Sequence, residues 1–221
     1  MQEVNHLAEG HAVPFDRIRE ALEVMPYGSD VRVMFEMLFL TGCRISELDN
    51  MKASKLFGNV LYWSLGKNQH GFRKEVLPDF YLKELAEYRK KNRTYADRLF
   101  GVNAHTFRRY FHKFIMPRLK GWHEKRLVDK QGVLQEEYIY QLKGLRKDYQ
   151  TLEFAKQLDK WKDAGVALQF TSKKMRHSCE RITAFHYIQE FDSLNIEKNM
   201  SLKTADILKD CISQTRLMDF S

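Results

Sequence analysis

The sequence predicts a mainly α-helical protein with a small antiparallel β-hairpin or sheet, an α+β fold. Several stretches repeat apolar residues at helical spacing, whereas residues 60–65 and 73–77 are short, rich in strand-forming residues and separated by a turn sequence, 68–71. The chain has 221 residues, of which 43% are hydrophobic and 13% aromatic. This length and composition suffice for one sizeable core, and we expect a single domain.

The net charge indicates the kind of binding partner, and the cysteine content indicates the redox environment of the protein. The chain carries 37 Lys and Arg against 29 Asp and Glu, a net charge of +8, which favours a polyanionic partner such as nucleic acid. Three scattered cysteines, Cys43, Cys179 and Cys211, favour a reducing compartment over a disulfide framework or a zinc site. No apolar run has the length of a membrane span. We expect an intracellular protein, in the cytoplasm, the nucleoid or a host cell, with no membrane partner.

Two helices and a turn that carries an arginine are expected in the first part of the chain. Residues 1–13 are polar and expected to be loose, and a helix follows at 15–25. The next helix, capped by Ser29 or Asp30, ends at Gly42, where glycine can adopt the left-handed conformation.

The stretch after Gly42 should restart as a polar helix that carries Arg44 and Glu47, with Ile45 and Leu48 on its inner face. Arg44 would then lie at the mouth of a packed helix junction, where a planar guanidinium can bind a phosphate with two donors. From these residues alone, an ordinary surface arginine is an equally good interpretation.

Helices are also predicted at 79–91 and 105–116. Apolar residues of the second follow helical spacing, and its other face is basic, with Arg108, Arg109, His112 and Lys113. This face either contacts phosphates or is simply solvated. Residues 101–150 hold eleven Lys or Arg against five Asp or Glu, which is most of the net charge.

Three motifs, in order, resemble the catalytic domain of tyrosine recombinases, the phage-integrase family. Residues 41–48, TGCRISEL, are similar to the first arginine box of the family. Gly66-Lys67 before the second strand of the hairpin is similar to its catalytic lysine strand. Residues 173–178, KKMRHS, should open a further helix and are similar to the second box, usually His-x-x-Arg-His. The resemblance extends over about residues 15–180.

The resemblance implies a site that breaks and rejoins DNA without a metal ion or any other cofactor. Arg44 and Arg176 would bind the non-bridging oxygens of the scissile phosphate, and Lys67 would protonate the leaving 5′ oxygen. Lys173 stands where the family usually has histidine, His177 would support the site, and Glu47 would orient an arginine. DNA contacts are expected from the basic side chains Arg73, Lys74, Arg108, Arg109 and Lys113.

The nucleophile of the family is a tyrosine near the C-terminus that forms a 3′-phosphotyrosine link. Tyr187 follows Arg176 by eleven residues, closer than the family spacing. The final segment, LKDCISQTRLMDFS, loosely resembles the last motif of the family, with Phe220 at the position of the tyrosine. Phenylalanine has no oxygen to attack phosphorus, so Phe220 is an engineered replacement, a natural change in a chain that does not cleave DNA, or an apolar anchor outside the motif.

We expect residues 1–221 to form one catalytic domain without a separate core-binding domain before it. Lys67 and Arg176 are 109 residues apart, longer than in a compact family member, which indicates an insertion at about 122–162. Residues 121–130 and 134–145 within this region are expected to be helical or loop. The insertion would wrap DNA, contact a neighbouring protomer or have no role.

Three functions remain open. The leading one is a site-specific recombinase of a mobile element or virus that binds double-stranded DNA as a homo-oligomer, a dimer or tetramer. The second is a DNA-binding regulator on the same fold that does not cleave. The third is a helical interaction protein with chance motif matches, for which DNA binding would be absent or insensitive to salt.

Overall fold

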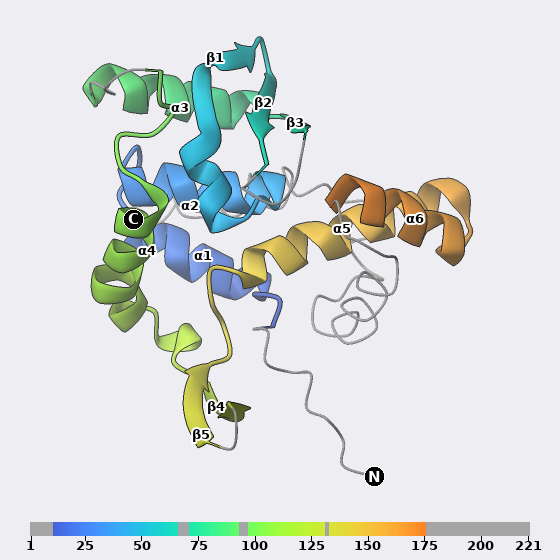
Figure 1. Ribbon diagram of the computed structural model, residues 1–221. Coiled ribbons are helices and arrows are strands. Elements are labelled where there is room, and N and C mark those ends of the chain that lie inside the picture. The colour runs from blue at the N-terminus through green and yellow to red at the C-terminus, as the bar shows by residue number, and fades with distance from the viewer. Residues whose placement is uncertain (1–10, 66–70, 93–96, 131–132, 176–221) are drawn as a thin grey trace, which may run out of the picture.

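The structure, a computed structural model, describes residues 11–65, 71–92, 97–130 and 133–175 (Figure 1). Within them the α-helices are α1 (Phe15–Val24), α2 (Asp30–Thr41), α3 (Asp79–Lys91), α4 (Ala104–Tyr110), α5 (Gly144–Trp161) and α6 (Ala164–Met175). The shorter helical segments are the 3-10 helices η2 (Ile45–Asn50), η4 (Met116–Arg118) and η5 (Lys120–Trp122) and the π-helix η3 (Phe111–Ile115). No helix among these residues is both long enough and apolar enough to cross a membrane.

The strands form two separate antiparallel sheets. One has three strands in the order β1 (Met51–Phe57), β2 (Val60–Ser64) and β3 (Phe72–Val76), and the other is a hairpin of β4 (Lys125–Lys130) and β5 (Val133–Tyr138). The predicted α+β class, mainly helical with a small antiparallel sheet, is confirmed.

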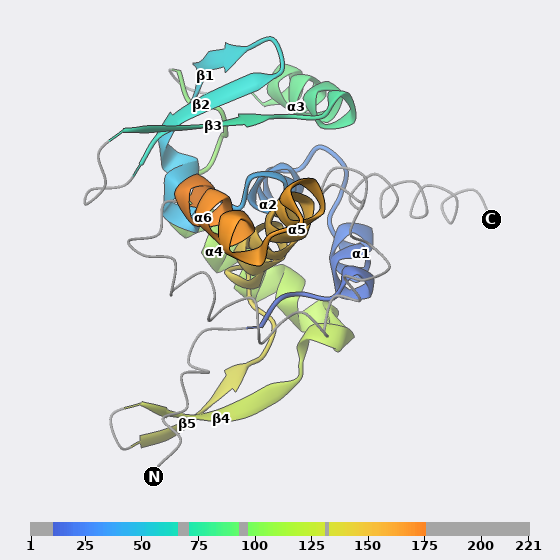
Figure 2. The same cartoon turned by 90° about the vertical axis from the view of Figure 1, so that its right-hand side faces the viewer.

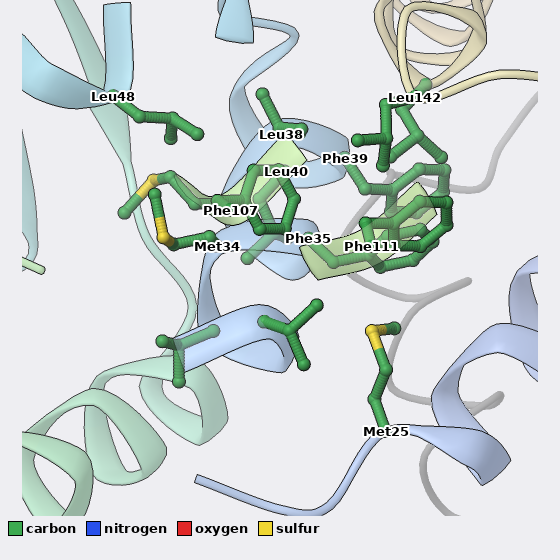
Figure 3. Packing of buried hydrophobic residues seen from close by; sticks show 14 of the residues in the cluster. Met25, Met34, Phe35, Leu38, Phe39, Leu40, Leu48, Phe107, Phe111 and Leu142 are labelled. Carbon is green, nitrogen blue, oxygen red and sulfur yellow. The ribbon is translucent and has the colours of Figure 1, made fainter. Parts of the chain in front are cut away.

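Helix α2 is the centre of the fold. Every residue of it after Asp30 is buried, and it contacts α3, α4 and α5. Aromatic side chains pack beside it, among them Phe35 and Phe111 (Figure 3). Phe35 stacks on Phe111 at 5.9 Å between ring centroids, and Phe111 lies 5.6 Å from Trp122. Burying each such side chain contributes roughly 1.5–3 kcal/mol to the stability of the fold.

The two ends of α2 are formed as the sequence predicts. The Oγ of Ser29 accepts a hydrogen bond from the backbone N–H of Arg32 at 3.3 Å and caps the helix. Gly42 ends it in the left-handed conformation, with φ of 57°. A Cβ at Gly42 would lie 2.5 Å from the ring of Tyr149 on α5. Both the turn and this close approach therefore require glycine.

Two predictions of local structure are wrong, and one strand was not predicted. Strand β1 was not anticipated, and residues 121–130 and 134–145, expected to be helix or loop, contain the hairpin β4–β5. Leu127 and Leu134 on this hairpin are each 67% exposed. The sequences of its two strands, KRLVDK and VLQEEY, lack the strict alternation of apolar and polar residues that identifies a strand.

Residues 12 and 13 also differ from expectation, and the range of the proposed insertion divides into two parts. Ala12 and Val13 are buried rather than loose, and the backbone N–H of Val13 donates to Oδ1 of Asp148 at 2.9 Å. Of the range 122–162, the hairpin β4–β5 extends away from the helices (Figure 2), whereas α5 packs on α2 and belongs to the core.

One buried charge cluster lies beside α2. The Nε of Arg32 donates to Oε1 of Glu36 at 3.0 Å and lies 3.5 Å from Oε1 of Glu84. Burial, together with the negative charge of Glu84, raises the pKa of Glu36 from 4.5 to about 8. Glu36 is therefore protonated in the native state at neutral pH.

This pKa predicts that Glu36 makes folding sensitive to pH. Between pH 5 and 8 the native state binds a proton that the unfolded chain has lost, so the stability should fall as the pH rises. The free energy of unfolding of the wild type should fall by about 2–4 kcal/mol more over this range than that of Glu36→Gln, in which glutamine mimics the neutral acid. Urea unfolding at several pH values measures both, with Glu87→Gln on the exposed face of α3 as the control. Parallel pH profiles for wild type and Glu36→Gln would contradict the assignment.

Candidate functional site

Arg44 lies directly before η2, where a buried carboxylate fixes its direction. Its side chain is 42% exposed, and Nη1 donates to Oε1 of Glu47 at 3.0 Å. Glu47 is 1% exposed, and its Oε2 accepts a hydrogen bond from Nε1 of Trp63 on β2 at 3.1 Å. Glu47, which is anchored in the core, thus holds the guanidinium of Arg44 on its inner side, and the outer side of the guanidinium faces the surface.

The exposed side of Arg44 borders a pocket with a volume of about 460 Å³. Its walls come from the segment around η2, from the start of α4 and from residues 142–146 at the start of α5. The basic side chains that line it are Arg44, Arg108, Lys143 and Arg146, with His105 beside them and Asp49 as the acidic member. Four cationic side chains around one concave site are suited to bind a phosphate group.

Arg146 connects the turn before Arg44 to the end of α6. Its Nη1 donates to the carbonyl oxygen of Gly42 at 2.5 Å, and its Nη2 donates to the carbonyl oxygen of Met175 at 3.0 Å. Burial, and then the positive charges of Arg73 and Arg44, lower the pKa of Arg146 to about 10. Burial is the largest cause, and the repulsion from the two neighbouring arginines, which a bound anion would relieve, adds to it.

Lys143 and Arg146 were not among the predicted site residues, although the sequence contains a signal for them. Lys143-x-x-Arg146 has the same spacing as Lys173-x-x-Arg176. Arg146 follows Lys67 by 79 residues rather than 109, so the excess length that suggested an insertion is reduced.

The residues that the sequence assigned to the second box are not found in this pocket among the described residues. Lys173 is exposed in the last described turn of α6, which begins at Ala164, so this motif does not open a helix. Lys173 does not line the pocket. Its neighbour Lys174 donates to Glu75 at 3.2 Å and to Glu153 at 3.0 Å. The remaining predicted site residues, Lys67, Arg176, His177 and Phe220, lie outside the described residues.

Among the predicted DNA contacts, Arg73 requires correction. It is 5% exposed, and its Nη1 and Nη2 donate to the carbonyl oxygens of Gly42 and Thr41. A guanidinium buried in this way is not a surface contact for DNA. The other four are exposed, and of these Arg108 lines the pocket whereas Lys74, Arg109 and Lys113 lie outside its lining.

A metal site is a separate question. In the part of the chain that the structure describes, no group of three or more His, Cys, Asp or Glu side chains lies close enough together to hold a metal ion. Cys43, next to Arg44, is buried, and burial raises its pKa to about 12, so it is a protonated thiol.

Comparison with known proteins identifies the fold. No family model matches the sequence, and no curated protein matches it. The solved structure of XerA recombinase is similar, with a TM-score of 0.56 and 17% identity over 85% of this chain and 61% of that chain. XerH site-specific recombinase bound to a palindromic difH substrate has a TM-score of 0.57 and 15% identity over 90% of this chain and 55% of that one.

A third similar structure is a lambda integrase dimer bound to a COC′ core site, with a TM-score of 0.51 and 16% identity over 80% of this chain and 59% of that chain. The chain thus spans about 55–61% of the length of these three proteins. Sequence identities this low show a shared fold and nothing more about function. The chain has a fold like that of the catalytic domain of tyrosine recombinases, as the sequence resemblance predicted.

Proposed function

We propose that this chain is the catalytic domain of a site-specific recombinase that cleaves and rejoins double-stranded DNA through a 3′-phosphotyrosine. The observation that carries the proposal is the convergence of Arg44, Lys143 and Arg146 on one pocket. These residues come from segments about a hundred positions apart in the sequence, on a fold shared with solved recombinases.

The two arginines supply the charge that the reaction needs. As the nucleophile attacks, negative charge grows on the non-bridging oxygens of the phosphate, and preorganised guanidinium groups stabilise it. We assign this role to Arg44 and Arg146, with Arg146 in place of Arg176. Glu47 holds Arg44 in position through the 3.0 Å contact between the two side chains.

Lysines provide the remaining donors. Lys143, three residues before Arg146, takes the place that the motif comparison gave to Lys173, and as a cation it can donate to a phosphate oxygen. Lys67 keeps its role as the general acid that protonates the leaving 5′ oxygen. Arg108 in the pocket and Lys74, Arg109 and Lys113 on the nearby surface would contact further phosphates.

Tyr187 is the nucleophile in this assignment. It follows Arg146 by 41 residues, so the objection that a tyrosine eleven residues after the second arginine is too close no longer applies. Its phenol oxygen would attack the phosphorus while Lys67 protonates the 5′ oxygen that leaves, so that one ester bond forms as another breaks. Phe220 is then an apolar residue outside the motif, and the chain as written can cleave.

The experiment is covalent capture of DNA by the wild-type chain. Nicked duplexes with a randomised central sequence trap the cleaved state, because the short strand released at the nick is lost by diffusion. Protein–DNA complexes that survive boiling in detergent, followed by mass spectrometry of the linked peptide, would identify the nucleophile.

The opposite result leads to the alternative function. If no covalent complex forms, while duplex binding weakens steeply with salt, the chain is a cleavage-inactive DNA-binding regulator on the recombinase fold. We further propose that the active form is a homo-oligomer on DNA, in line with the lambda integrase dimer bound to its core site.

A further inference from the structure

Arg73 is a buried arginine that the proposed chemistry does not use directly. It lies on the inner face of β3, on the returning strand of the hairpin that carries Lys67. Its guanidinium carbon lies 5.4 Å from the ring centroid of Trp63 on β2 and 5.6 Å from that of Tyr149 on α5. The planar group is therefore held by two aromatic rings from different elements.

The donors of Arg73 converge on the turn that precedes Arg44. Nη2 donates to the carbonyl oxygen of Thr41 at 2.5 Å, and Nη1 donates to that of Gly42 at 3.2 Å. The carbonyl of Gly42 is also the acceptor for Arg146. One peptide oxygen thus receives hydrogen bonds from Arg73 and Arg146, two residues before Arg44.

Arg73 has no carboxylate partner among the described residues, since its partners there are carbonyl oxygens, aromatic rings and, at 3.7 Å, the sulfur of Met175. Its positive charge contributes to the lowered pKa of Arg146. A buried cation without an anionic partner is unfavourable, and a hydrophobic side chain of similar volume would fill such a space at lower cost. The charge and the fork of donors therefore point to a role beyond packing.

We propose that Arg73 is a positioning residue for the phosphate-binding arginines. It fixes the Thr41–Gly42 peptide against β3, which sets where Arg44 and Arg146 lie relative to each other. This inference rests on the proposed function, because it assigns Arg73 a role in the same phosphate site. Lysine cannot reproduce it, because an ammonium lacks the two parallel donors that reach both carbonyl oxygens.

The test compares Arg73→Lys, alone and combined with Arg44→Ala. Misplacement of a catalytic group by about 1 Å lowers a rate by about 100-fold, and we expect this loss of cleavage for Arg73→Lys when it is measured at saturating duplex. In the Arg44→Ala background, Arg73→Lys should cost less than about threefold more, since its effect passes mainly through Arg44. Arg89→Lys, the same exchange on the exposed face of α3, is the control and should cleave at the wild-type rate.

A second readout does not require cleavage. If Arg44 contacts a phosphate, Arg44→Ala lowers the slope of log affinity against log salt by about one, and Arg73→Lys should lower it by a similar amount. The role of Arg73 would be overturned if Arg73→Lys lowered cleavage equally in the wild-type and Arg44→Ala chains. It would also be overturned if Arg73→Lys left the salt slope of the wild type unchanged. A wild-type chain that binds but never cleaves would reject the enzyme instead, and the salt slope would then decide on Arg73. Should Arg73→Lys not fold, Arg73→Met, which keeps the apolar stem, takes its place in both comparisons.

Discussion

Tyr187→Phe should abolish the covalent protein–DNA complex. The substitution removes one oxygen atom, and without it no phosphotyrosyl bond can form. Because the ring is retained, the duplex affinity and its salt dependence should stay within about twofold of the wild type. Denaturing gels of reactions with nicked duplex measure the covalent complex, and filter binding measures the affinity.

Phe220→Tyr is the matched control for this prediction. It places a phenol at the position that the C-terminal motif comparison suggests, and it should leave the yield of covalent complex unchanged. A complex that persists in Tyr187→Phe would come from a nucleophile other than Tyr187, and not from position 220, which is still phenylalanine in that variant. A complex that appears only with Phe220→Tyr would instead move the nucleophile to position 220. The second outcome would also mean that the natural chain binds DNA without cutting it.

Arg146→Ala is expected to lower the rate of strand cleavage by about 10³-fold. Removing one preorganised donor from an anionic transition state typically costs two to three powers of ten, and here the residue also carries a charge. Arg176→Ala, in the motif that first suggested the second arginine, should change the rate by less than about tenfold. Single-turnover cleavage of the nicked duplex gives both rates.

Arg146 also has a structural role that must be separated from catalysis. Its hydrogen bonds to the carbonyl oxygens of Gly42 and Met175 tie α5 to the central turn and to α6, so alanine should also cost about 1–3 kcal/mol of stability. Cleavage must therefore be measured well below the Tm of each variant. If Arg176→Ala loses far more activity than Arg146→Ala at equal folded fraction, the original motif assignment is correct.

Much of the fold was accessible from the sequence because its signals are local. Helical spacing of apolar residues located α1, α2 and α3, and Gly42 marked the end of α2. The hairpin β4–β5 and strand β1, MKASKLF, were missed because their sequences show no clear alternation of apolar and polar residues. The predicted helix at 105–116 is α4 followed by the π-helix η3, since a wide turn leaves no distinct pattern in the apolar spacing.

The site was only partly accessible for a different reason. Arg44 could be found because a local motif surrounds it, and Glu47 lies one helical turn away. Lys143 and Arg146 follow the hairpin β4–β5, whose sequence gives no clear strand signal. Residues 173–178, KKMRHS, match the second box of the family more completely, so the second arginine was assigned there. The burial of Arg73 could not be foreseen, because it depends on Tyr149 from a helix more than seventy residues later.

The π-helix η3, Phe111–Ile115, determines how the chain can respond to loss of a residue between α4 and Trp122. The backbone N–H of Met116 bonds to the carbonyl oxygen of Phe111, five residues earlier, so this turn holds one residue more than an α-helical turn. Loss of a single residue within this turn would let the same donor and acceptor close an α-helical turn, so the segment that follows would keep its orientation. Trp122 would then keep its place beside Phe35, so this turn should tolerate loss of one residue better than a regular α-helical turn, where the same deletion rotates everything downstream by about 100°.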